Sequence, residues 1–160
     1  MSLLQKSGKH IVPRRQIQGD PTDRQSTSKM ATTTNDNTSE EKAVLDIIDA
    51  LLSCLPSKDI SKALEVCLPS GGTATMRGTE LSVQPIQNLI ESVLTILGLV
   101  EERFIDPGVR IYEDLAMMWS KNEVKLDGDV TSVGMNVVSL HKIEEKWKIT
   151  SIADTAKPPA

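Results

Sequence analysis

Apolar residues recur every three or four positions in three segments of the chain, a spacing that predicts amphipathic helices. The first segment follows Thr38, which has the spacing of a capping box with Glu41. It ends at Pro56, because the residue before a proline disfavours helical geometry. The second helix is predicted within residues 57–68. The third begins near Pro85, which suits the first turn of a helix, and continues to about Leu97.

After Gly98 the spacing of apolar residues changes to two, which predicts strands. We expect strands over residues 99–105, 109–112, 115–126, 130–142 and 146–155, with an earlier short strand in the sequence TATMRG. Asp106-Pro107-Gly108 is predicted as a turn and Asp127-Gly128 as a two-residue hairpin. Helices followed by an antiparallel meander indicate an α+β fold, with three N-terminal helices packed on a mostly antiparallel sheet.

Both faces of the predicted sheet are substantially apolar. With two-residue turns at Asp127-Gly128 and at Glu144-Glu145, one face carries the larger side chains. This face includes Met117, Trp119, Glu123, Ser132, Asn136 and Ser151. We therefore expect the helices to cover this face. A β-bulge would exchange part of this face with the other one.

The polar residues on the helix-covered face predict a pocket. An apolar cavity with a few inward polar groups is typical of a small-molecule site. The predicted pocket residues are Trp119, Ser132, Asn136, Ser151 and Met117. The alternative is a packed core whose polar residues lie at a frayed end of the sheet.

The opposite face needs another cover. It carries Met118, Val133, Met135, Val137 and Ile152. Three helices can cover only one face, so we expect a second copy of the chain to pack here as a homodimer.

Composition separates a tail from a folded domain. Residues 1–38 hold six basic and three acidic side chains among aperiodic polar residues, whereas the whole chain has a net charge of −4. We therefore expect a disordered tail over 1–38 and one domain over 39–157. Two readings of the tail remain open: a mitochondrial presequence, and upstream sequence before a second start at Met30.

Charge and hydropathy exclude several partners. The folded part carries a charge of −7 once the tail is set aside, and aromatic residues are 2% of the chain, so a nucleic-acid partner is not expected. The longest apolar stretch, 89–100, is too short to cross a bilayer, so no membrane partner is expected. These features predict a cytoplasmic protein.

The strand region resembles the nuclear transport factor 2-like, or SnoaL-like, superfamily. The resemblance covers about residues 39–157. It is carried, in order, by Leu115, Ala116, Trp119, Asp127, Gly128, Gly134, Asn136, Leu140, Trp147, Lys148 and Ile149. It implies three N-terminal helices over a curved sheet (the cystatin-like cone), a deep pocket and frequent homodimers. The superfamily includes ketosteroid isomerases, scytalone dehydratase and polyketide cyclases.

The sequence departs from its relatives at two pocket positions. Asn122 and Ser132 stand where many relatives have an aromatic residue and a histidine. The remaining candidate base is Glu123, with Asp154 as a second candidate that needs a bulge to face inward. The competing interpretation makes Glu123 a solvated charge at the strand edge, paired with Lys121 or Lys125.

No cofactor or metal site is expected. His10 lies in the tail, His141 has no second ligand nearby in the sequence, and Cys54 and Cys67 have the placement of buried packing thiols. We therefore expect a pocket protein for an apolar, polyketide- or steroid-like small molecule. The alternatives are a cofactor-independent isomerase, dehydratase or cyclase with an acidic base, and a dimeric protein-interaction module.

Overall fold

The computed structural model describes residues 36–160, with side chains from residue 39 onward. Residues 1–35, most of the segment predicted as a disordered tail, lie outside the described residues, as do His10 and Met30. The elements are, in order, α1 (Asp36–Ser57), α2 (Ile60–Val66), β1 (Cys67–Arg77), β2 (Glu80–Pro85), α3 (Ile86–Leu94), β3 (Val100–Tyr112), β4 (Leu115–Leu126), β5 (Asp129–Ile143) and β6 (Lys146–Lys157).

The three predicted helices are present, with different starting points. α1 begins at Asp36, so Thr38 lies inside the helix and the predicted cap at Thr38 is wrong. α2 is capped by Asp59, whose carboxylate accepts a hydrogen bond from the Lys62 backbone N–H at 3.1 Å. α3 starts directly after Pro85 as predicted, because a proline there gives up no helical hydrogen bond.

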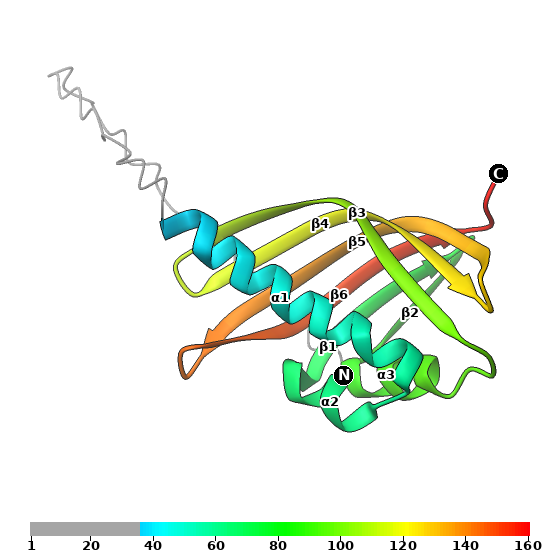
Figure 1. Ribbon diagram of the computed structural model, residues 1–160, viewed down its shortest axis with the longest axis horizontal. Helices are drawn as coiled ribbons and strands as arrows, with labels where there is room; N and C mark the ends of the chain where they lie inside the picture. Colours follow the sequence, from blue (N-terminus) through cyan, green and yellow to red (C-terminus); the bar gives the residue numbers. More distant parts are fainter. Residues whose placement is uncertain (1–35) are drawn as a thin grey trace, which may run out of the picture. The chain divides into compact units, whose positions relative to one another are not determined.

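The six strands form one sheet in the order β2-β1-β6-β5-β4-β3 (Figure 1). All neighbouring pairs are antiparallel except β1 and β6, which are parallel. The α+β class and the mostly antiparallel sheet are confirmed. The short strand predicted at TATMRG is the second half of β1 and precedes α3 as expected, whereas β2 was not predicted as a strand.

β3 runs continuously through the predicted turn at Asp106-Pro107-Gly108. Its register with β4 shifts between Ile105 and Gly108, so these residues form an irregularity within one strand. Ser120 on β4 bridges the gap, because its buried hydroxyl accepts a hydrogen bond from the Ile105 N–H at 3.1 Å. The proline therefore lies in a bulge of an edge strand, where a missing ladder hydrogen bond is tolerated.

Two further bulges occur in the central strands, and both are formed by a threonine. Thr131 is the extra residue where β5 pairs with β4, and Thr150 is the extra residue where β6 pairs with β5. Each hydroxyl donates a hydrogen bond to a carbonyl of the neighbouring strand, Thr131 to Val124 O and Thr150 to Ser139 O, both at 3.3 Å. Each bulge reverses the in-and-out alternation for the rest of its strand pair.

Because of these bulges, the side chains of β4 and of part of β6 lie on the opposite face of the sheet from the one predicted. We call the helix-covered face the inner face and the opposite one the outer face. Met118 is fully buried on the inner face, although it was predicted on the outer face. Met117 and Trp119 are 39% and 51% exposed on the outer face, so their predicted inward placement is wrong.

The second bulge reverses the distal half of β6. Ser151 pairs with Ser139 on the outer face, and Ile152 pairs with the buried Val138 on the inner face. Both placements are the opposite of the predicted ones. The physical reason is the single extra residue at Thr150, which a two-residue turn does not reveal.

The core lies between the helices and the inner face, where the strands curve past α1 (Figure 1). Val44 and Ile48 of α1 pack here with Met118, Leu140 and Ile149 of the sheet, all at 1% exposure or less. The start of α1 is fixed by Glu40, which accepts hydrogen bonds from Trp147 Nε1 at 2.8 Å and Lys142 Nζ at 3.1 Å. These contacts lower the pKa of Glu40, chiefly through the indole N–H and then the ammonium.

Candidate functional site

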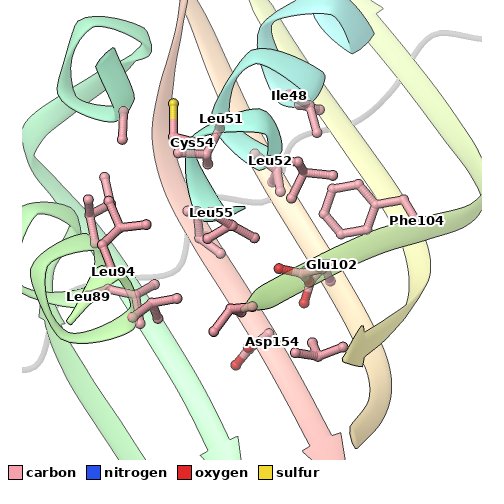
Figure 2. A pocket seen from close by; sticks show the side chains of 18 of the residues that line it. Ile48, Leu51, Leu52, Cys54, Leu55, Leu89, Leu94, Glu102, Phe104 and Asp154 are labelled. Carbon is pink, nitrogen blue, oxygen red and sulfur yellow. The ribbon is translucent and has the colours of Figure 1, made fainter. Parts of the chain in front are cut away.

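A cavity of about 240 Å³ lies between α1, α3 and the inner face of the sheet. Figure 2 shows leucine side chains of α1 and α3 along one part of the cavity, with Glu102 and Asp154 together in another part. An engineered apolar cavity of ~150 Å³ holds benzene, so this one has room for a somewhat larger molecule.

Glu102 of β3 is one of two carboxylates that line this cavity, the other being Asp154 of β6. The neighbours of Glu102 at strand spacing, Val100 and Phe104, also line the cavity, which places all three on the inner face. Glu102 Oε1 accepts two hydrogen bonds, from Asn122 Nδ2 at 2.7 Å and from Asn136 Nδ2 at 2.9 Å. The carboxyl group is therefore held in one orientation by amides from two neighbouring strands.

Burial controls the protonation of this carboxyl. The loss of hydration raises the pKa of Glu102 above its usual value. The two amide donors and the Arg77 guanidinium oppose this rise, whereas the negative charge of Asp154 adds to it. A carboxyl group with a raised pKa exchanges protons closer to neutral pH, which is what general acid–base chemistry requires.

Arg77 and Asp154 form an ion pair at the same cavity. Arg77 Nη1 and Nη2 donate to Asp154 Oδ1 and Oδ2, each at 2.8 Å. Arg77 is on β1 and Asp154 on β6, the parallel pair of strands. Arg77 is half exposed and Asp154 is mostly buried, so the pair lies where the cavity approaches solvent.

The two asparagines that hold Glu102 are themselves buried, at 4% and 5% exposure. Their amide oxygens, Asn122 Oδ1 and Asn136 Oδ1, have no hydrogen-bond partner within residues 39–160. Gly134 lies opposite Asn122, and a Cβ there would overlap the Thr155 carbonyl oxygen. Glycine at this position therefore allows the close strand approach beside the Asn122 side chain.

The sequence-predicted site residues separate into two groups. Ser132, Asn136 and Asp154 line the cavity, and Asp154 faces inward because of the Thr150 bulge. Trp119, Met117 and Ser151 were predicted in the same pocket, but the reversed register places them on the outer face.

Glu123, the first candidate base, also lies on the outer face. Its Oε1 is 3.1 Å from Arg103 Nε and 4.0 Å from Lys125 Nζ. The inward placement of Glu123 is therefore wrong, and its surroundings match the competing interpretation of a paired strand charge.

Sequence reasoning missed Glu102, although a signal was present. Residues 99–105 were predicted as a strand, and Val100, Glu102 and Phe104 alternate along it at strand spacing. A carboxylate between two apolar residues on one strand face is a candidate for burial.

The cysteines and histidine of the described part take no role in this site's chemistry. Burial raises the pKa of the Cys67 thiol to about 12, so it stays protonated at neutral pH. Burial likewise raises the pKa of Cys54, which lines the cavity as an apolar thiol. His141 of β5 is not among the residues that line the cavity, and its Nδ1 lies 2.7 Å from Thr150 Oγ1.

Residues 36–160 contain neither a cluster of metal ligands nor a helix suited to cross a membrane. No group of three or more His, Cys, Asp or Glu residues in this range is arranged to hold a metal ion. None of the helices described here combines the length and the apolar character needed to cross a bilayer.

A groove between α1 and β3 borders the same carboxyl. Its lining includes Asp49 and Ser53 of α1 and Arg103 of β3, and it shares Leu52, Glu102 and Phe104 with the cavity. Glu102 is therefore bordered both by an apolar cavity and by a polar, solvent-open groove.

Comparison with known proteins identifies the fold. No family model matches the sequence, and no curated protein matches it. A proposed dehydratase of the nuclear transport factor 2-like family from Streptomyces avermitilis superposes with a TM-score of 0.64 at 11% identity, over 78% of this chain and 99% of that one.

Two proteins of unknown function show the same likeness. The nuclear transport factor 2-like protein from Pseudomonas putida KT2440 has a TM-score of 0.64 at 13% identity, over 75% of this chain and 88% of that one. The one from Shewanella baltica OS155 has a TM-score of 0.62 at 14% identity, over 76% and 97%. The nuclear transport factor 2-like fold predicted from the strand motifs is confirmed.

Proposed function

We propose that this protein binds an apolar small molecule in the cavity between α1, α3 and the inner face of the sheet. The observation that carries the proposal is the combination of an apolar lining with one oriented, half-buried carboxyl at Glu102. Natural ligand sites combine mostly apolar walls with a few placed polar groups in this way.

Direct binding of small probes tests the proposal. The full chain is titrated with n-octanol and with methyl hexyl ketone, and binding is followed by changes in backbone amide NMR signals. Val93 lines the cavity from α3, so Val93→Trp should fill the space and weaken binding of both probes at least tenfold. Gln87→Trp, at an exposed position on the same helix, is the matched control. Unchanged binding in Val93→Trp would place the ligand site elsewhere.

A second candidate function is cofactor-independent acid–base catalysis by Glu102. It is favoured by the raised pKa of this carboxyl and by the two amides that orient it. The reaction class is isomerisation or dehydration, in which one group takes a proton from carbon and delivers it to carbon or to a departing hydroxyl. The similar structure from Streptomyces avermitilis is itself described as a proposed dehydratase.

A β-hydroxy ketone with a hexyl chain is a suitable probe of this chemistry. Its dehydration breaks a C–H and a C–O bond and forms an unsaturated ketone and water, which NMR detects. Glu102→Gln should abolish any acceleration and leave probe binding nearly unchanged, since the amide cannot accept the proton. Glu123→Gln, on the outer face, should keep full activity. Equal activity in Glu102→Gln would refute a catalytic role.

We also propose that the outer face mediates homodimer formation. Leu115, Met117 and Trp119 of β4 are 46%, 39% and 51% exposed there. The proposed interface includes Val133, Met135 and Val137 of β5, as predicted from sequence. It excludes Met118 and Ile152, which face the core. An apolar surface of this extent is typical of an interface rather than of a monomer surface.

A further inference from the structure

Acidic and basic side chains are unequal in number at the polar end of the cavity. Among residues 39–160, the charged residues of its lining are Glu102, Asp154 and Arg77. Arg77 Nη1 and Nη2 donate to the two carboxylate oxygens of Asp154, so the charges of these two residues offset each other. The carboxylate of Glu102 is therefore left without a cation of its own in this lining.

The neighbouring groove between α1 and β3 does not supply the missing cation. In the described part of the chain, the charged residues that line it are Asp49, Glu101, Glu102 and Arg103. Arg103 Nε lies 3.1 Å from Glu123 Oε1, so its charge is engaged on the outer face of the sheet. Both spaces that border Glu102 therefore have more acidic than basic side chains, and this excess attracts positively charged molecules.

One oxygen of the Glu102 carboxyl group is accessible to a ligand. Asn122 Nδ2 and Asn136 Nδ2 both donate to Oε1, which fixes the direction of the other oxygen, Oε2. The side-chain polar atoms of residues 39–160 that are both enclosed and unpaired are Asn122 Oδ1 and Asn136 Oδ1. Glu102 Oε2 has no hydrogen-bond partner in the same range but is not one of these enclosed atoms, so a ligand group can reach it.

A cation at Oε2 would stabilise the ionised form of this carboxyl group. The loss of hydration raises the pKa of Glu102, whereas the two amide donors and the charge of Arg77 oppose this rise. A second positive charge would act in the same direction as Arg77, because a nearby opposite charge favours the ionised carboxylate. Solvent screens such a pair less in a partly apolar cavity than on the protein surface.

From these contacts, and on the basis of the proposed binding function, we propose that the cavity prefers ligands that carry one positive charge on an apolar body, the class of the apolar primary amines. The ammonium group donates to Glu102 Oε2 and balances the charge at the polar end. The apolar body packs against leucines of α1 and α3 that line the same cavity, such as Leu51 and Leu89 (Figure 2).

Probes of equal chain length and different charge test this preference. Dissociation constants of the full chain for octylammonium, n-octanol and octanoate are measured at neutral pH by the same NMR titration. Octylamine is protonated at this pH, as a lysine side chain is. We expect octylammonium to bind about tenfold more tightly than n-octanol, as one hydrogen bond to a charged group would provide. Octanoate should bind more weakly than n-octanol, since it meets an excess of acidic side chains.

Two substitutions should change the preference in opposite directions. Glu102→Gln removes the unpaired charge, so the ratio of the n-octanol to the octylammonium dissociation constant should fall toward one. Arg77→Gln removes the basic residue of the lining and should raise this ratio by about threefold, a modest effect because the guanidinium is half exposed. A general loss of packing would not produce opposite changes, and each variant serves if the other does not fold.

Glu123→Gln is the matched control. It removes an acidic charge from the outer face, outside the cavity lining, and should leave the ratio unchanged. Val93→Trp, which fills the cavity, should weaken octylammonium binding together with n-octanol binding. Octylammonium binding that Val93→Trp leaves intact would place the ammonium outside the cavity and overturn the inference.

The remaining outcomes separate this inference from the function beneath it. Equal or weaker binding of octylammonium relative to n-octanol, or an unchanged ratio in both Glu102→Gln and Arg77→Gln, would overturn the amine preference and leave the binding site in place. Failure of all the probes to bind would overturn the proposed function and the preference together.

Discussion

The inner and outer faces of the sheet have similar side chains and different surroundings. Met118 and Met117 are adjacent on β4, yet Met118 is fully buried and Met117 is 39% exposed. The two helices that flank the cavity cover the first face, and none of the described elements covers the second. Apolar composition therefore does not identify the core face of this sheet, because both faces satisfy it.

The same contrast applies to the acidic residues. Glu102 on the inner face is held by two neutral amides, and the loss of hydration raises its pKa. Glu123 on the outer face lies beside Arg103 and Lys125. Among amides and apolar walls, the loss of hydration favours the protonated form of a carboxyl group such as Glu102. Residue type alone therefore does not show which glutamate belongs to the cavity, whereas its neighbours do.

The largest expected effect is on the free energy of unfolding, and it distinguishes Met118 from Met117. Met118→Ala removes fully buried side-chain atoms and should lower the free energy of unfolding by about 2–5 kcal/mol. Met117→Ala, measured by the same urea denaturation at low protein concentration, should change it by less than about 1 kcal/mol. A larger loss of unfolding free energy in Met117→Ala than in Met118→Ala would support the register predicted without bulges.

The next effect concerns the outer face alone. Trp119→Glu places a charge in the proposed homodimer interface and should weaken dimerisation by roughly 30-fold or more, as truncation of a central interface tryptophan does. Sedimentation equilibrium measures the change, and Val137→Asp should act in the same direction.

Leu97→Glu supplies the matched control for the interface. Leu97 is 89% exposed after α3 and lies outside the proposed interface, so its substitution should leave dimerisation unchanged. A wild-type chain that sediments as a monomer at high concentration would remove the outer face from consideration as an interface.

A smaller effect distinguishes the two glutamates by pH. Because the folded-state pKa of Glu102 is raised, the folded chain binds this proton more tightly than the unfolded chain does. Its contribution to stability is full below the usual value of 4.5 and is lost as pH rises through the raised pKa. Glu102→Gln should abolish this loss, so the difference in stability between variant and wild type should shift in favour of the variant between acidic and neutral pH.

Chemical denaturation at several pH values checks this prediction. Glu123→Gln is the outer-face control and should not reproduce the relative gain. A stability difference for Glu102→Gln that is constant with pH would show that burial does not perturb this carboxyl in the folded chain.

The smallest effect concerns the bulge that separates the two faces on β6. Thr150→Val removes the hydroxyl that donates to Ser139 O and should cost about 0.5–1.5 kcal/mol of unfolding free energy. Thr155→Val, at an exposed position on the same strand, should cost less. Amide NMR contacts between Val138 and Ile152 should persist in Thr150→Val, since backbone pairing holds the bulge; their loss would show that the hydroxyl sets the register.

The sequence by itself determined the elements and the fold class. The spacing of apolar residues predicted α3 and the bounds of β4, and the Asp127-Gly128 signal predicted the hairpin that joins β4 to β5. The strand motifs predicted the nuclear transport factor 2-like fold. These features depend on local periodicity and on turn chemistry, both of which are encoded by neighbouring residues.

The tertiary structure alone decided which side chains meet. The extra residue at Thr131 places Met118, and not Trp119, on the inner face. The extra residue at Thr150 places Ile152, and not Ser151, on the same face. The site around Glu102 joins β3 to β4 and β5, and its neighbouring ion pair joins β1 to β6. A strand has a side-chain period of two, so a single inserted residue reverses every later position, and no local pattern in this sequence fixes where that insertion lies.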